Sequence, residues 1–552
     1  MLTAQRPMEA TQRVNSAPRA RGSALALFFA RSAPGAILLL IYLCAALPLG
    51  LFADVPFHDD WTYAWSVEHL LKVGELDVLD WSIHYPFAQV LWGALFCLPF
   101  GFSFSALRIS TAALAWLGAL ALYGTLRELG RARIESLTAA VALVANPVFF
   151  VLSYSFMTDV PFVSVANIAF FFLVRGLLRD RPLELYVGCG FALLAFLIRQ
   201  IAIAIPAAVL LYASMEPSFK SRRFLLPPLF ASLAMCLTAF WIAQSFGLTS
   251  AYTDRKWVLG KWLNAHELSI PGFLRVAVHM GLALFPFTMT LAAGWYRRAL
   301  FWGALAFLSV LLVCSIVFTP ETPKPLEGMW NLAALGKERR LLRGFPDPPL
   351  FPFWLNYPLL AFSLVSAASM SVKCGDAAAR EKPLRLFAGY ALAQLGLIVA
   401  VWLFDAWGSD RYSIVLLPPL LVLLAGGALK LKPVLAGVGV LFLVALLMTW
   451  SETRNNRTAA AALAWLRDRG VPFSEIDAGY ALNGWHLYAH PENLAPGALR
   501  ERDVPFVTTN EEKRYLVATS PLPGYREIRR YSWSLPFGAR DYSIHVLEKA
   551  AD

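Results

Sequence analysis

Long apolar runs alternate with short polar segments through the first 451 residues of the chain. A run of about 20 apolar residues can cross the hydrocarbon core of a membrane as a helix. Clusters of Lys and Arg separate the runs, and such clusters stay on the cytoplasmic side. About thirteen runs fit this rule and are predicted to cross the membrane: residues 33–53, 106–126, 136–153, 160–178, 184–198, 201–215, 224–246, 272–294, 298–319, 353–371, 386–405, 412–429 and 433–451.

One further apolar run, residues 86–102, does not fit a full crossing. A crossing there would reverse every later span and place basic clusters on the wrong side of the membrane. The run is also short, begins at Pro86 and ends at Gly101. We therefore predict a re-entrant or juxtamembrane segment.

The pattern divides the chain into three parts. Residues 1–31 carry five arginines among Ala, Ser and Pro and are predicted to form a disordered cytoplasmic arm. Residues 32–451 form the transmembrane domain. Residues 452–552 contain no membrane-length run and are predicted to form a small α/β domain outside the cytoplasm. We expect its elements at residues 457–469 (helix) and 473–478, 515–519, 525–533 and 541–547 (strands).

Composition agrees with this fold class, an all-α polytopic membrane protein with a small C-terminal α/β soluble domain. Of the 552 residues, 58% are hydrophobic and only 15% are charged. The net charge of +11 comes from clusters between apolar runs, so we expect no nucleic-acid partner. The six cysteines form no CxxC pair, and neither a disulfide framework nor a zinc site is indicated.

The loop of residues 54–85, which follows the first span, is acidic and is predicted to lie outside the cytoplasm. Asp59 and Asp60 stand next to each other there, between His58 and Trp61. Charges close to a bilayer are costly, which favours a functional role for the pair. The alternative is a solvated loop in which Asp caps helices and forms turns.

Three later features return to the same surface in this topology. Asp159 opens a span just before Pro161, although an ordinary helix start looks the same. Arg199 and Gln200 interrupt an apolar stretch, and Arg199 needs either an anionic ligand or a structural salt bridge. Arg411 and Tyr412 open a late span.

Two outer loops, residues 247–271 and 320–352, are unusually basic. They could bind a phosphate-bearing ligand or neutralise lipid headgroups. In the C-terminal part, Tyr480, Trp485, His486, Tyr488 and His490 form a cluster in sequence. These residues could contact an acceptor or pack in the domain core.

These motifs resemble the polyprenyl-phosphate-dependent glycosyltransferases of GT-C fold, in particular the protein O-mannosyltransferase group and the aminoarabinose transferases. The resemblance covers the layout of residues 33–450. It implies catalytic roles for Asp59 and its acidic neighbour Asp60. It also implies that Asp159 contacts substrate or a divalent metal ion, which Asp59 would share, and that Arg411 and Tyr412 contact substrate.

Many members of this group have a Lys before the Pro that follows the first loop, where this chain has His84-Tyr85-Pro86. His84 and Tyr85 are therefore candidates for binding the donor, with Arg199 and Gln200 as further candidates. The implied donor is a polyprenyl-phosphate-linked sugar, and the acceptor is a hydroxyl of a lipid, glycan or protein. With Asp59 as general base, transfer would invert the anomeric carbon.

A transporter or flippase of lipid-linked sugars is the alternative function. Such proteins usually show related halves and polar residues at mid-membrane, whereas here the candidate residues gather at one surface. We predict an integral membrane protein of the bacterial inner membrane, surrounded by membrane lipids. Its active site and C-terminus are expected to face the periplasm.

Overall fold

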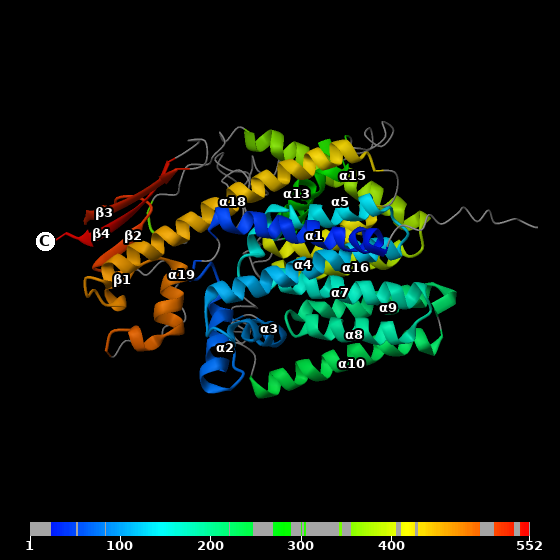
Figure 1. Cartoon of the computed structure of the whole chain (residues 1–552), viewed down its shortest axis with the longest axis horizontal. Helices are drawn as coiled ribbons and strands as arrows, with labels where there is room; N and C mark the ends of the chain where they lie inside the picture. The colour runs from blue at the N-terminus through cyan, green and yellow to red at the C-terminus, as the bar shows by residue number, and fades with distance from the viewer. Residues whose placement is uncertain are drawn as a thin grey trace, which may run out of the picture.

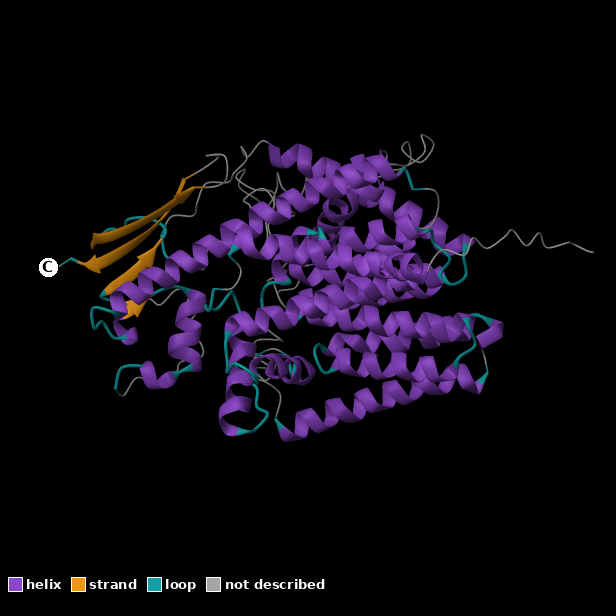
Figure 2. Cartoon of the chain, viewed as in Figure 1, coloured by secondary structure: helices purple, strands orange, loops and turns teal. Residues whose placement is uncertain are grey.

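The computed structural model describes residues 24–50, 53–82, 84–219, 221–246, 269–288, 300, 303–304, 342–344, 355–404, 410–425, 429–496, 513–534 and 541–550. Helices make up most of this part of the chain, and a small sheet lies near the C-terminus (Figures 1 and 2). The predicted fold class is confirmed at this level.

The N-terminal half of the helical bundle runs from an apolar helix that begins at Ala24 to a helix that ends at Ser245 (Figure 1). Its helices are α1 (Ala24–Leu49), α2 (Asp60–Val73), α3 (Phe87–Cys97), α4 (Phe104–Glu128), α5 (Arg133–Val144), α6 (Pro147–Leu152), α7 (Asp159–Leu178), α8 (Pro182–Phe196), η1 (Gln200–Ile203), α9 (Ala204–Met215), η2 (Pro217–Phe219) and α10 (Arg222–Ser245). The later helices are α13 (Ser269–Thr288), α15 (Asn356–Arg380), α16 (Leu384–Phe404), the 3-10 helix η7 (Asp410–Leu416), α17 (Leu417–Leu424) and α18 (Leu431–Arg467).

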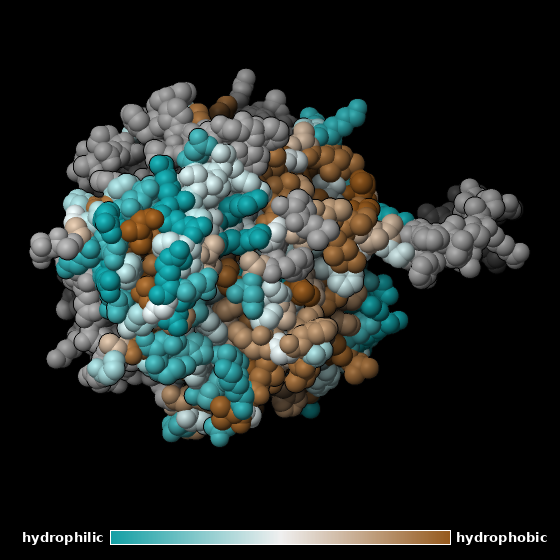
Figure 3. Space-filling view, turned by 60° about the vertical axis from the view of Figure 1, so that its left-hand side comes forward, coloured by the Kyte–Doolittle hydropathy of each residue, from teal (hydrophilic) through white to brown (hydrophobic). Residues whose placement is uncertain are grey.

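Within the described residues, five helices are long and apolar enough to cross a membrane: α4, α7, α10, α15 and α18. Shorter apolar helices, among them α8 and α16, pack beside them. Hydrophobic side chains gather over the bundle, whereas hydrophilic side chains gather at the end that carries the sheet (Figure 3). This distribution is typical of a protein embedded in a membrane by its helical part.

Two predicted spans differ from the helices observed, and a third cannot be compared with them. The stretch 136–153 is divided into α5 and α6, because Asn146 caps a new helix through a 3.0 Å bond from the Phe149 amide and Pro147 follows it. The stretch 412–429 begins as η7 and continues as α17, which has eight residues. The span 298–319 lies largely outside the described residues.

Helix α3 occupies the apolar run that the topology left unassigned. It has 11 residues and is therefore roughly 16 Å long, about half the thickness of a bilayer core. It packs against α2 and α4 at one end of the bundle (Figure 1). This length agrees with a juxtamembrane or re-entrant segment.

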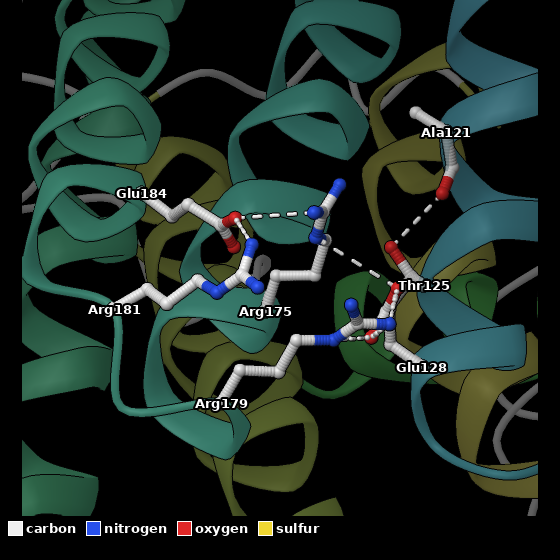
Figure 4. Close-up of polar contacts among 7 residues, drawn as sticks. All are labelled: Ala121, Thr125, Glu128, Arg175, Arg179, Arg181 and Glu184. Carbon is white, nitrogen blue, oxygen red and sulfur yellow. Dashed lines mark hydrogen bonds and ion pairs between the residues drawn. The ribbon is translucent and has the colours of Figure 1, made fainter.

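At the opposite end of the bundle, basic residues are paired with acidic ones. Arg179 binds Glu128 through two hydrogen bonds of 2.8 Å, which join the ends of α7 and α4 (Figure 4). Arg175 and Arg181 both reach Glu184 of α8, at 3.1 and 3.2 Å. This end carries several of the basic clusters that were predicted to be cytoplasmic.

The long helix α18 connects the bundle to the sheet. It has 37 residues and continues past residue 451, so it spans both predicted domains. Leu463 and Leu466 on its last turns belong to one buried cluster with Val517 and Val546 of the sheet. The bundle and the sheet are therefore joined by a continuous helix with a packed end.

The sheet has four strands in the order β1 (Ile476–Asp477), β2 (Tyr515–Ala518), β4 (Asp541–Lys549) and β3 (Tyr525–Ser534). β1 pairs with β2 in parallel, and the other pairs are antiparallel. Between β1 and β2 the chain forms α19 (Tyr480–Asn483) and a π-helix at Gly484–Ala489. This insertion leaves the sheet and returns towards α2 (Figure 1).

Candidate active site

The acidic loop is fixed to the start of α4 by partly buried polar contacts. The Arg108 guanidinium donates to the carbonyls of Ala53 and Val55. The Asp54 carboxylate accepts a 2.6 Å hydrogen bond from the Phe104 amide. The loop therefore has a defined path up to the start of α2.

A left-handed residue precedes Asp59. His58 has φ of 52°, which is uncommon for a residue other than glycine. Its imidazole is buried, and Nε2 lies 3.8 Å from a Glu452 carboxylate oxygen of α18. Burial lowers the pKa of His58 to about 4. The His58 imidazole is therefore neutral at pH 7.

Asp60 points into the protein and contacts backbone. Its side chain is fully buried and accepts hydrogen bonds from the amides of Phe57, at 2.6 Å, and Phe156, at 3.4 Å. Burial raises the pKa of Asp60 to about 7. This aspartate joins the acidic loop to the segment before α7 and does not share the partners of Asp59.

Asp59 contacts two side chains that come from distant parts of the sequence. Its Oδ2 lies 3.0 Å from Nη1 of Arg411 in η7. Its Oδ1 accepts a 2.5 Å hydrogen bond from the Tyr480 hydroxyl of α19. The Asp59 side chain is 23% exposed, so a substrate can reach it.

A second acid–guanidinium pair lies at the start of α7. Nη1 of Arg199 is 2.5 Å from Oδ1 of Asp159, and the two side chains are only 6% and 2% exposed. The salt bridge that was considered for Arg199 is thus present. The Tyr412 ring lies between the pairs, since the guanidinium carbons of Arg199 and Arg411 are 5.5 and 5.3 Å from its centroid.

The buried hydroxyl of Tyr63 in α2 connects the two pairs electrostatically. Burial raises its pKa, and the charges of Arg411, Asp59, Arg199 and Asp159 all act on it. Tyr63 was not among the residues predicted from the sequence, because a single Tyr in an amphipathic helix carries no distinctive signal. Because both guanidinium groups lie over the Tyr412 ring, the two ion pairs belong to one site.

His84 and Gln200 lie beside these cations. Their side chains are hydrogen-bonded, and desolvation together with the charges of Arg199 and Arg411 holds the pKa of His84 well below its usual range. His84 is therefore neutral at pH 7 and can act as a hydrogen-bond partner only. Tyr85 lies against the rings of Phe87 and Phe246, at 6.0 and 5.9 Å.

The two predicted metal ligands are each paired with a guanidinium in this structure. Oδ2 of Asp59 is bound to Arg411, and Oδ1 of Asp159 is bound to Arg199. Within the described residues, no three His, Cys, Asp or Glu side chains gather as a ligand set. We derive no step through a metal.

Most of the two basic outer loops lies outside the described residues. Of the stretch 320–352, the described part includes Arg343, whose Nε is 2.6 Å from Oδ2 of Asp477. This arginine therefore has a structural partner at the end of β1. Loop 247–271 contributes only Ser269, Ile270 and Pro271, at the start of α13.

Comparisons with known proteins agree with the resemblance inferred from the sequence. Residues 84–243 match the family model described as dolichyl-phosphate-mannose-protein mannosyltransferase. No curated protein matches the chain.

Solved structures with a similar course of the chain include ArnT from Cupriavidus metallidurans in the apo state, at 13% identity and a TM-score of 0.43, covering 94% of this chain and 98% of that one. ArnT from the same organism bound to undecaprenyl phosphate is 13% identical, with a TM-score of 0.42, and the match covers 95% of this chain and 98% of that one. A third structure is the archaeal oligosaccharyltransferase AglB from Archaeoglobus fulgidus in complex with an inhibitory peptide and a dolichol-phosphate. It is 13% identical, with a TM-score of 0.39, and the match covers 88% of this chain and 62% of that one. The family-model match confirms, for residues 84–243, the resemblance to the dolichyl-phosphate-mannose-dependent protein mannosyltransferases.

Proposed function

We propose that this protein is a membrane glycosyltransferase that moves a sugar from a polyprenyl-phosphate donor to an acceptor hydroxyl, with inversion at the anomeric carbon. The match of residues 84–243 to a mannosyltransferase family model supports the predicted enzyme class and favours it over a transporter or flippase. The acceptor is a lipid, a glycan or a protein.

The observation that carries this proposal is the pairing of one accessible carboxylate with a cluster of guanidinium groups. Asp59 is 23% exposed, whereas Asp159 is 2% exposed and bound to Arg199. An acceptor hydroxyl can therefore approach Asp59 but not Asp159. We assign Asp59 as general base and Asp159 as the residue that positions Arg199.

The two arginines suit the other half of the reaction. As the bond between sugar and phosphate breaks, negative charge grows on the departing lipid phosphate, and guanidinium groups stabilise it. Arg411 and Arg199 flank Tyr412 and lie close enough to act on the same groups. In its neutral state His84 can add a hydrogen bond to a phosphate oxygen.

An apolar cavity near η7 offers room for part of the polyprenyl chain. It has a volume of about 310 Å³ and lies between α13, α15, α16 and α17. Its lining includes Leu416 of η7, the 3-10 helix that carries Arg411, and Ala391 of α16. A lipid whose phosphate meets Arg411 would have an apolar space within reach of its tail.

We further propose about thirteen membrane crossings and a location in the bacterial inner membrane, with the site and the C-terminus facing the periplasm. The separation of ends supports this arrangement. The Asp59 site and the C-terminal sheet lie at one end of the bundle, whereas the paired basic clusters lie at the other (Figures 1 and 4).

The direct test is Asp59→Asn with a polyprenyl-phosphate sugar donor. We expect transfer to fall by roughly a hundredfold to ten-thousandfold, because a general base contributes about that much. Asp77→Asn is the matched control, since Asp77 is an exposed carboxylate of the same loop. Wild-type transfer rates in purified Asp59→Asn would contradict the assignment of Asp59 as base.

A further inference from the structure

Tyr480 is held in place by the local structure at the end of β1. The Asp477 carboxylate accepts hydrogen bonds from the backbone amide of Gly479, at 3.1 Å, and from the side-chain amide of Asn483, at 2.7 Å. Gly479 has φ of 86° and ψ of 173°, a backbone conformation that is essentially restricted to glycine. This turn directs α19 away from the sheet and towards the acidic loop.

The rest of the insertion docks on the same loop. Tyr488 donates a 3.0 Å hydrogen bond to Asp80, and its ring lies edge-on to Trp61 and Trp81. His490 reaches Glu68 of α2 at 3.2 Å. Several anchors thus hold residues 480–490 against loop 54–85 and do not depend on Tyr480.

The hydrogen bonds around Tyr480 fix the direction of its proton. The Trp81 indole can only donate, and its Nε1 lies 3.0 Å from the Tyr480 oxygen. The Tyr480 hydroxyl therefore accepts from Trp81 and gives its own proton to Oδ1 of Asp59. Burial and the charge of Asp59 raise the pKa of Tyr480, so this proton stays on the tyrosine at working pH.

We propose that Tyr480 is a positioning residue for catalysis, which holds the Asp59 carboxylate in a fixed orientation together with Arg411. Each oxygen of Asp59 then has one fixed partner, and the carboxylate cannot rotate about its terminal bond. The inference rests on the proposed role of Asp59 as general base. It makes the C-terminal part of the chain a component of the active site.

A different reading of the same contact is that the Tyr480 hydroxyl occupies the place of the acceptor hydroxyl. Under that reading Tyr480 would block the site, and its removal would increase the rate. Under the positioning role its removal decreases the rate. The direction of the change therefore separates the two readings.

The test compares Tyr480→Phe with Tyr488→Phe. Both variants remove one hydroxyl from the same docked insertion, but only Tyr480 contacts Asp59. We expect Tyr480→Phe to lower kcat by about tenfold to a hundredfold, the range for a hydrogen bond to a charged group. Tyr488→Phe should retain most of the wild-type kcat, because the Tyr488 hydroxyl bonds Asp80 and not the proposed base.

The pH dependence of kcat gives a readout that a structural role would not move. A hydrogen bond donated to a carboxylate favours its charged form. In Tyr480→Phe the acidic limb of the profile should therefore move to higher pH, and in Tyr488→Phe it should stay in place. Equal losses in both variants with unchanged profiles, or a higher kcat in Tyr480→Phe, would overturn the proposal.

A double-mutant cycle on thermal unfolding tests the contact without any activity. Tyr480→Phe should destabilise the wild-type protein more than it destabilises Asp59→Asn, since the shared interaction is already altered there. Equal effects in both backgrounds would refute the contact. If Asp59→Asn transfers sugar normally, the assignment of Asp59 as general base fails, and the positioning role fails with it. If Asp59→Asn is inactive and Tyr480→Phe behaves like Tyr488→Phe, only the positioning role fails.

Discussion

Asp59 and Asp60 are neighbours in sequence but have opposite environments. The Asp59 side chain is partly exposed and bound to Arg411, whereas that of Asp60 is buried and bound to backbone amides. A helix that begins at Asp60 turns successive side chains by about 100°, so the two carboxylates cannot share one site. The sequence indicated the importance of the pair, but it could not separate the two roles.

The buried state of Asp60 predicts a pH-dependent stability. Because its pKa is raised from 3.8 to about 7, its contribution to stability is full below about pH 4 and is lost as the pH rises through about 7. The groups whose charges act on it are Arg108 and Asp59. The side chain in Asp60→Asn cannot ionise, so this variant should lack the pH-dependent contribution of Asp60 to stability.

The measurement is the unfolding temperature of both proteins in detergent from pH 5 to pH 8. Asp60→Asn should be less stable at pH 5, because its amide cannot accept from both Phe57 and Phe156. The difference between the proteins should then shrink as the pH rises. Two parallel curves would show that Asp60 does not titrate in this range.

At the scale of elements, hydrophobic periodicity was sufficient to predict the positions of long helices and strands. The predicted run 106–126 corresponds to α4, and the predicted strand at 525–533 corresponds to β3 (Tyr525–Ser534). Hydrophobic periodicity could not predict an element where the backbone geometry changes without a change in the polarity of the side chains. The last three residues of η7, Ile414–Leu416, are as apolar as those of α17, so the change from 3-10 to α geometry there leaves no mark in the sequence.

The apolar cavity between the helices predicts a chain-length effect. In Ala391→Phe a large ring would fill part of the 310 Å³ space. Transfer from a donor with a long polyprenyl chain should then show a higher KM, whereas a donor with a short chain should be unaffected. Ala393→Phe is the control, because Ala393 lies on the same helix and is not part of the cavity lining.

Kinetics with both donors in both variants distinguish a lipid site from a packing void. If Ala391→Phe lowers the rate equally for long and short donors, the substitution has disturbed the bundle and the cavity has no role in donor binding. Overpacking in a filled core typically costs about 1–3 kcal/mol, so thermal unfolding should be recorded in parallel.

At the scale of the whole molecule, the site is assembled from segments hundreds of residues apart. Asp59, Asp159, Arg199 and Arg411 were predicted together because the topology set by the basic clusters places all four on one side of the membrane. Tyr480 was predicted only as part of an aromatic cluster in the C-terminal domain. Its contact with Asp59 depends on the length of α18 and on the turn after β1, and neither is visible as a motif.

The aromatic cluster packs in a hydrophobic core, which was one of the two roles considered for it, but this core is shared with the helical bundle. Trp485 stacks on Phe102 at 5.4 Å and Tyr488 packs on Trp61 at 5.8 Å, so the rings cover α2 and the segment before α4. A surface of this kind binds two parts of one chain together. The sequence of the C-terminal domain alone could not predict this packing, because the partner rings belong to the membrane domain.

The separation of the two ends of the bundle predicts which residues are reachable from each side of the membrane. In a variant without the six native cysteines, Asp77→Cys on the acidic loop should react with an impermeant thiol reagent added from the periplasmic side. Arg380→Cys, whose side chain is 74% exposed at the end of α15, should react only after the membrane is opened. Both positions are exposed, so a lack of labelling reflects sidedness and not burial.

The native basic clusters provide the physical reason for this orientation, because Lys and Arg resist translocation. Loss of one exposed pair between Arg380 and Asp376 is worth little energetically, so Arg380→Cys should not invert the protein. Asp468→Cys, just after α18, reports on the C-terminal part and should label together with Asp77→Cys. If Asp468→Cys and Arg380→Cys instead react from the same side, α18 would not separate them across the membrane. The proposed number of crossings and the periplasmic position of the Tyr480–Asp59 contact would then both be wrong.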